Sequence, residues 1–139
     1  MSTLSVNTIK SLGTGAPVFQ NSSGTEKGRL AKAYVNFDGS FSATTFTLDN
    51  GGMRTAYNVT SITDNGGTGL YTVNFVSGTF TSVNYIAAGI TGNYGGITTS
   101  NHSIMPNGTR TVTAFPIRIV SGSSGNASKA DISLVFFGD

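Results

Sequence analysis

The stretch that decides the fold runs from Tyr57 to Phe75 and reads YNVTSITDNGGTGLYTVNF. Two runs rich in β-branched and aromatic residues, Ala56–Thr63 and Leu70–Phe75, flank the tetrapeptide Asp64-Asn65-Gly66-Gly67. Asn-Gly and Gly-Gly supply the positive φ angles that a tight turn needs, at little steric cost. The stretch therefore predicts a β-hairpin.

The rest of residues 33–139 also predicts short strands separated by turns. Ala33–Asp38 alternates apolar and polar residues, and Phe41–Leu48 ends at the turn sequence Asp49-Asn50-Gly51-Gly52. Further strands are expected at Phe80–Ile90, Ile97–Ile104, Thr109–Val120 and Ala130–Phe137. Pro116 lacks an N–H, so its strand is expected to lie at an edge or to carry a bulge. Because no segment has a helical period, we expect an all-β head domain over residues 33–139, an antiparallel β-sandwich of jelly-roll type.

The last expected strand is apolar on both of its faces. Ile132, Leu134 and Phe136 alternate with Val135 and Phe137. Such a strand is buried on both sides, so it lies centrally in a sheet or packs its second face against another chain. Only 10% of the residues are charged, against about 25% in an average domain, and few charges are present to keep exposed edges apart. A closed homo-oligomer is therefore expected.

The composition also argues against several classes of function. The chain has no cysteine, which excludes disulfides, thiolate zinc sites and cysteine nucleophiles. A net charge of +2 from dispersed cations does not predict a nucleic-acid partner. No apolar run approaches the roughly 20 residues of a membrane span, and we expect no membrane insertion. The N-terminus lacks the charged and apolar regions of a secretory signal, which indicates synthesis in a cytoplasm.

Residues 1–32 differ from the remainder and predict an extended N-terminal arm. Gly, Ser, Asn and Pro17 interrupt any sustained period, and one short strand is expected near Leu4–Lys10. Leu12, Val18 and Phe19 give the arm apolar anchors that a solvated tail does not need, so we expect the arm to dock onto a partner. The alternative is a terminus with no function.

Candidate chemical sites are few, and turn chemistry explains most of them. Asp38-Gly39-Ser40-Phe41-Ser42 matches the D-x-S-x-S pattern of some divalent-cation sites, but a strand follows it where such sites have a helix. Asp49 and Asp64 are explained as turn-initiating residues. The single histidine, His102, lies in a loop-like sequence without a second imidazole. We therefore expect no catalytic residues, no metal and no cofactor, and we do not expect an enzyme.

A binding surface is the more plausible functional feature. Tyr94 in Gly92-Asn93-Tyr94-Gly95-Gly96 is an amphipathic ring on a glycine-rich segment, which suits stacking on a sugar or anchoring a partner. Asn93 and His102 are grouped with it as possible ligand or partner contacts. The alternative places Tyr94 inside its own domain or at a contact between subunits.

Four segments carry a resemblance to a known family: MSTLSVNTIKSLGTGAPVF at residues 1–19, KAYVNFDG at 32–39, NVTSITDNGGTGLYTVNF at 58–75 and ISLVFFGD at 132–139. They resemble small virion proteins of tailed bacteriophages, of the tail-fibre or receptor-binding type. The resemblance implies a structural protein of the virion that forms a homotrimer. It also implies an arm that docks onto other virion proteins and a head that attaches to a glycan or protein of the host surface.

The chain departs from that family in one respect. Fibre proteins usually carry a long shaft between the attachment segment and the head, and this sequence has none. The alternative is therefore a capsid decoration or cement protein, whose arm would lie across neighbouring capsid subunits. The family provides no residue-level binding site that can be transferred to this chain.

Overall fold

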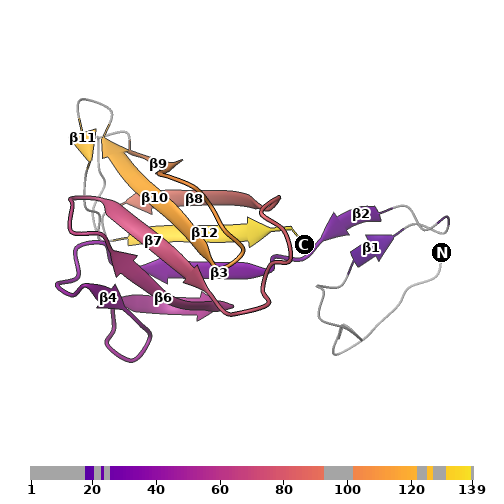
Figure 1. Cartoon of the computed structure of the whole chain (residues 1–139), viewed down its shortest axis with the longest axis horizontal. Coiled ribbons are helices and arrows are strands. Elements are labelled where there is room, and N and C mark those ends of the chain that lie inside the picture. Colours follow the sequence, from indigo (N-terminus) through magenta and orange to yellow (C-terminus); the bar gives the residue numbers. More distant parts are fainter. Residues whose placement is uncertain are drawn as a thin grey trace.

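The computed structural model describes residues 18–20, 23, 26–92, 102–121, 125–126 and 131–138. These residues contain strands and no helix, and every strand pair is antiparallel. The strands form two larger sheets and one separate two-stranded sheet (Figure 1). The predicted all-β class is confirmed.

One of the two larger sheets has four strands in the order β5-β3-β12-β8, and we call it the smaller sheet. Its strands are β3 (Ala33–Phe37), β5 (Met53–Tyr57), β8 (Ile86–Gly92) and β12 (Asp131–Phe137). In β12, Leu134 lies opposite Val35 of β3 on one side and opposite Gly89 of β8 on the other. The C-terminal strand is therefore central, which is one of the two positions that its apolar faces predicted.

The larger sheet has the order β11-β10-β7-β6-β4, and β9 also pairs with β10. Its strands are β4 (Thr45–Phe46), β6 (Val59–Asp64), β7 (Leu70–Phe75), β9 (His102–Pro106), β10 (Ala114–Ser121) and β11 (Gly125–Asn126). β6 and β7 form the predicted hairpin, with Ile62 opposite Val73. In its turn, Gly66 has φ 75°, and the Asp64 carboxylate accepts a hydrogen bond from the Gly66 N–H at 2.9 Å.

The core lies between these two sheets and is rich in aromatic rings. Phe37 of β3 meets the edge of Tyr71 of β7, with ring centroids 5.3 Å apart. Phe136 of β12 meets Phe75 of β7 at 4.9 Å and Phe115 of β10 at 5.6 Å, again edge to face. All five rings are buried. The sheets thus pack face to face, and each such aromatic pair adds about 0.5–1.5 kcal/mol beyond the apolar area that it buries.

The predicted strand Ala56–Thr63 is in fact parts of two strands. β5 belongs to the smaller sheet and β6 to the larger one, and the chain crosses between them at Asn58. Asn58 has φ 55°, a left-handed conformation that asparagine tolerates better than most residues. The prediction was wrong here because a run of β-forming residues does not reveal a corner between sheets.

Two other predicted strands are shorter than expected. Of Phe41–Leu48 only β4 is a strand, because the Asn50 side-chain oxygen accepts hydrogen bonds from the N–H groups of Thr47 (2.9 Å) and Gly52 (3.0 Å). These bonds satisfy the two backbone N–H groups within a turn, so neither group needs a partner strand. The strand expected from Phe80 begins at Ile86. Phe80 instead packs into the core, stacked on Tyr85 with ring centroids 4.4 Å apart.

Pro116 lies in β10 at a local edge of the larger sheet. β10 pairs with β7 along Ala114–Arg118, whereas its pairing with β9 starts only at Ile117. The Pro116 C=O accepts a hydrogen bond from the Asn107 N–H at 2.9 Å, on the side away from β7. Its missing N–H therefore falls where the β9 ladder ends. β10 itself lies inside the sheet, between β7 on one side and β9 and β11 on the other, and has no bulge at Pro116, so the predicted edge strand or bulge was wrong.

The N-terminal residues that the structure describes form a small hairpin. β1 (Val18–Gln20) and β2 (Glu26–Arg29) make the two-stranded sheet, which lies beyond the end of the two larger sheets in Figure 1. No strand was predicted there, and the strand expected at Leu4–Lys10 lies outside the described residues. Lys32 already belongs to the body, since it is buried and its N–H donates to the Phe136 C=O at 2.9 Å.

Candidate interaction face on the smaller sheet

The face of the smaller sheet that points away from the core carries the most prominent exposed side chains. Strand alternation places Ile132, Leu134 and Phe136 in the core and turns Val135 and Phe137 to the other side. The register joins Ala88, Val135, Tyr34 and Tyr57 into one row across the sheet. We call this side of the sheet the outer face.

The β8 side of the outer face is apolar. Ile86 and Ile90 of β8 are 69% and 74% exposed, which makes them the most exposed large hydrophobic residues that the structure describes. Ile86 lies opposite Phe137, and Ile90 lies opposite Ser133. β8 is an edge strand without Lys or Pro, and these are the residues that commonly prevent an edge from associating. This part of the face is therefore suited to contact with another apolar surface.

The β3 and β5 side of the outer face carries two stacked tyrosines. The rings of Tyr34 and Tyr57 lie 5.8 Å apart at an interplanar angle of 27°. They are 42% and 52% exposed, so each ring has surface left for a further contact. Tyrosine combines an apolar ring with a polar hydroxyl and loses little conformational entropy on binding.

Polar side chains continue the outer face beyond the tyrosines. Arg54 forms ion pairs with Asp38 at 3.2 Å and with Asp131 at 3.3 Å. The Asn36 side-chain NH2 donates to Asp131 and also to the Ser133 hydroxyl at 2.8 Å. Strands β3, β5 and β12 are thus linked by a polar network, which we call the Arg54 network. It places hydrogen-bonding groups next to the aromatic pair.

Two of the carboxylates that were weighed as cation ligands, those of Asp38 and Asp64, are engaged in turns and an ion pair. Asp38 accepts hydrogen bonds from the Ser40 N–H (2.9 Å) and hydroxyl (2.6 Å) in addition to its ion pair with Arg54. Asp64 caps the hairpin turn. In the part of the chain that the structure describes, no group of three or more His, Cys, Asp or Glu residues could hold a metal ion.

The sequence-predicted contact residues are only partly placed by the structure. Asn93, Tyr94 and the arm residue Leu12 lie outside the described residues. Val18 and Phe19 lie in β1. His102 is half-buried and is the first residue of β9, opposite Ser121, so it lies in a strand, as the predicted strand Ile97–Ile104 implied, and not in a loop.

Tyr34 and Tyr57 were missed as candidate contact residues. Tyr34 was placed correctly on the polar face of its strand, but that face gave no reason to single it out. Only the pairing of β3 with β5 brings Tyr57 beside it. A sequence signal existed, since a tyrosine on the polar side of an alternating strand is an exposed aromatic ring.

Comparisons with known proteins leave the family open. No protein-family model, no curated protein and no solved structure matches this chain. Over the residues that the structure describes, no helix is long and apolar enough to cross a membrane.

Proposed function

We propose that this chain is a structural protein of a tailed-bacteriophage virion, of the tail-fibre type, which attaches the particle to a glycan or protein of the host surface. The observation that carries the proposal is the exposed Tyr34–Tyr57 pair beside the Arg54 network on the outer face. The resemblance of residues 32–39 and 58–75 to fibre-type heads supports it. The protein is made in the host cytoplasm and resides in the virion.

The chemistry of the face favours a saccharide among the possible host ligands. The apolar side of a sugar ring packs on an aromatic ring, while its hydroxyls need hydrogen-bond donors and acceptors close by. Tyr34 and Tyr57 supply the rings. Asn36 and Arg54 supply polar groups two and three positions along the same strands, and Asp131 supplies one from the neighbouring strand β12. The proposal includes binding without cleavage.

Assembly forms part of the same proposal. The two packed sheets constitute a β-sandwich of jelly-roll type that assembles as a homotrimer, and the residues before Lys32 form the arm that docks onto other virion proteins. The apolar β8 side of the outer face supports the trimer, because Ile86 and Ile90 gain most from being covered by another subunit.

Capsid decoration is the second candidate function, and one observation favours it. The β1–β2 hairpin lies beyond the end of the two larger sheets, where it could lie on a neighbouring capsid subunit while the body projects from the shell (Figure 1). In that role, particles that lack the protein would release their DNA at a lower temperature. Under the attachment role, such particles would keep intact heads and lose adsorption.

A glycan array made from host-surface polysaccharides tests the attachment role directly. We expect the full chain to bind at least one polysaccharide, and we expect Tyr34→Ser and Tyr57→Ser each to weaken binding at least about tenfold. Leu48→Ser is the matched control, since Leu48 is 52% exposed but lies in the loop before β5.

Tyr94→Ser, measured in the same assay, shows whether the ligand binds at the predicted contact residue Tyr94 or at the Tyr34–Tyr57 pair. Binding that is lost only in Tyr94→Ser would move the site away from the outer face. Binding that all these variants retain would contradict the proposed site. Release of reducing sugar by the purified chain would contradict binding without cleavage.

A further inference from the structure

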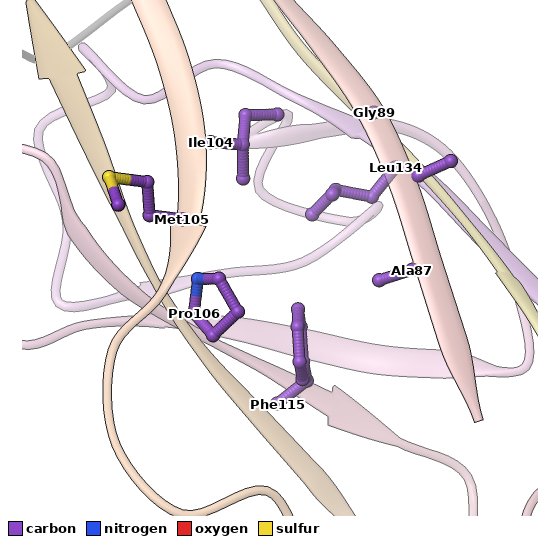
Figure 2. A pocket seen from close by; sticks show the side chains of 8 residues that line it. Ala87, Gly89, Ile104, Met105, Pro106, Phe115 and Leu134 are labelled. Atoms are coloured by element: carbon purple, nitrogen blue, oxygen red, sulfur yellow. The ribbon is translucent and has the colours of Figure 1, made fainter. Parts of the chain in front are cut away.

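A small cavity lies between β8 and β9, where the two larger sheets are adjacent without pairing. Its volume is about 80 Å³, and it is lined by Ala87, Ala88, Gly89, Ile104, Met105, Pro106, Phe115 and Leu134. Figure 2 shows Ala87, Ile104, Pro106, Phe115 and Leu134 directed toward the space, whereas the Met105 side chain points away from it. None of these residues is charged, so the cavity is suited to an apolar occupant.

The floor and the mouth of the cavity differ in exposure. Phe115 and Leu134 are each 4% exposed and form its floor. Ala88, Gly89, Met105 and Pro106 are exposed, which opens the cavity to the surface. Gly89 keeps this mouth open, since a Cβ at that position would lie 3.0 Å from the Ile104 side chain.

The size of the cavity matches an aliphatic side chain. A cavity of about 150 Å³ accommodates benzene, whereas a single water takes up about 30 Å³. A space of about 80 Å³ therefore suits a group of three or four carbons, such as the branched end of isoleucine.

The same chain exposes such a side chain on the same strand. Ile90 is 74% exposed on the outer face of β8, while its neighbours Ala88 and Gly89 line the cavity. Ile86 lies four residues along the strand on the same face, 69% exposed. A protrusion and a matching recess are thus present on two sides of one edge strand, and one subunit cannot fit its own Ile90 into its own cavity.

We propose that Ile90 of one subunit inserts into the cavity between β8 and β9 of a second copy of this chain. The occupant is a second copy because the chain itself carries both complementary parts and few charges to oppose their contact. The contact is heterologous: the surface of one subunit that carries Ile90 meets a different surface on the next. Contacts of this kind close into a ring when the rotation between subunits allows it, which is how a trimer forms. The inference rests on the self-assembly included in the proposed function and adds the residues that make the contact.

Single substitutions in the protrusion and in the recess test the two halves separately. Ile90→Asp places a charge on the protrusion, and Ala87→Leu fills the recess. By analytical ultracentrifugation of the full chain, we expect each to weaken association at least about a hundredfold. Leu48→Asp is the matched control, with the same change of charge at a 52% exposed residue away from β8. Circular dichroism and Tm confirm the fold, and Ile104→Phe fills the recess from β9 if Ala87→Leu does not fold.

Mixing the two variants provides the decisive result. The Ala87→Leu chain keeps its Ile90, and the Ile90→Asp chain keeps its recess, so each mixed pair retains one intact contact. We expect the mixture to form a 1:1 heterodimer, whereas each variant alone stays monomeric. No complex on mixing would overturn the inference, because a symmetric contact that needs Ile90 on both sides gives that result.

Two further outcomes separate this inference from the proposed function. A wild-type trimer that both variants preserve would overturn the contact and leave self-assembly standing. A wild-type chain that stays monomeric at all concentrations would overturn both the contact and the homotrimer. Glycan binding by the monomeric variants is measured separately, and its loss or retention addresses attachment alone.

Discussion

Asn58 controls the path of the chain at the scale of a single residue. Its φ of 55° turns the backbone from β5 in one sheet to β6 in the other. Its side-chain NH2 donates to the Lys32 C=O at 2.7 Å, and its own C=O accepts from the Val76 N–H at 3.1 Å. The left-handed conformation and the side-chain hydrogen bond together explain why asparagine suits this position.

Substitution of Asn58 separates these two contributions. Asn58→Gly keeps the left-handed conformation and loses the side-chain hydrogen bond, which we expect to cost about 1 kcal/mol. Asn58→Ala loses the same hydrogen bond and also places alanine in a left-handed conformation, which costs about 1–2 kcal/mol more. We therefore expect its free energy of unfolding to fall by about 2–3 kcal/mol in total. Urea unfolding measures both variants. Equal losses in the two would show that the conformation of residue 58 contributes nothing.

Tyr85 contributes a stability that the protein loses at alkaline pH. The ring is 2% exposed, and its hydroxyl donates toward the C=O groups of Thr111 (3.0 Å) and Ala114 (3.2 Å). Burial raises the pKa of Tyr85 above its usual value of 10.0, and the charge of Arg110 offsets part of this effect. The unfolded chain therefore releases this proton at a lower pH than the folded protein does.

The sign of the pH effect follows from linkage. The stability that Tyr85 contributes is complete below the unfolded pKa of 10.0 and declines as the pH rises from there toward the higher folded pKa. Urea unfolding at pH of about 8.5 and about 10.5 should show a loss in the wild type that is smaller in Tyr85→Phe. An identical loss in both proteins would assign the pH dependence to other groups.

At the scale of elements, β8 depends on a close approach to β12 at Gly89. A Cβ at this position would lie 2.5 Å from the Ser133 C=O oxygen and 2.7 Å from a Leu134 methyl carbon. The first of these atoms is backbone in the central strand and cannot move aside easily. Gly89 is therefore required by the packing of β8.

Gly89→Ala should consequently destabilise the protein by about 1–3 kcal/mol, as overpacking commonly does. Gly92→Ala in the same strand is the matched control, because nothing lies within 4 Å of a Cβ there. We expect it to change the free energy of unfolding by less than about 0.5 kcal/mol. Similar losses in both variants would indicate a general effect of glycine replacement in β8.

The elements that the sequence predicted correctly are those whose stability is local. Leu70–Phe75 matches β7 residue for residue, because alternation and the Asp64–Gly67 turn both lie in that segment. The central place of β12 is one of the two positions that its apolar faces predicted. β4 and the start of β8 were mispredicted because Asn50 and Phe80 act through side-chain contacts that periodicity does not encode.

The candidate site was less predictable than the fold, for a physical reason. Tyr34 and Tyr57 are 23 positions apart in the sequence, and the Arg54 network joins residues from β3, β5 and β12. Both depend on strand pairing between distant segments. Tyr94 attracts attention in the sequence because it is surrounded by glycines, whereas a site assembled across a sheet has no local signature.

At the scale of the whole molecule, residues 31–139 should fold without the preceding segment. Among the residues whose burial the structure describes, the core begins at Ala33, and Lys32 is joined to the body by hydrogen bonds with Phe136 and Asn58. We expect a chain of residues 31–139 to lower Tm by less than about 4 °C, the shift that a loss of about 1 kcal/mol produces. Differential scanning calorimetry measures it, and an unfolded product would show that the first 30 residues belong to the folding unit.

The position of the protein on the virion tests the central claim most directly. The measurement is immunogold electron microscopy of intact particles, with an antibody raised against the full chain and preimmune serum as the control. The attachment role predicts gold confined to the tail. Gold distributed over the capsid would contradict that role and support decoration of the shell, and virions in which blotting after denaturation detects no protein would contradict both.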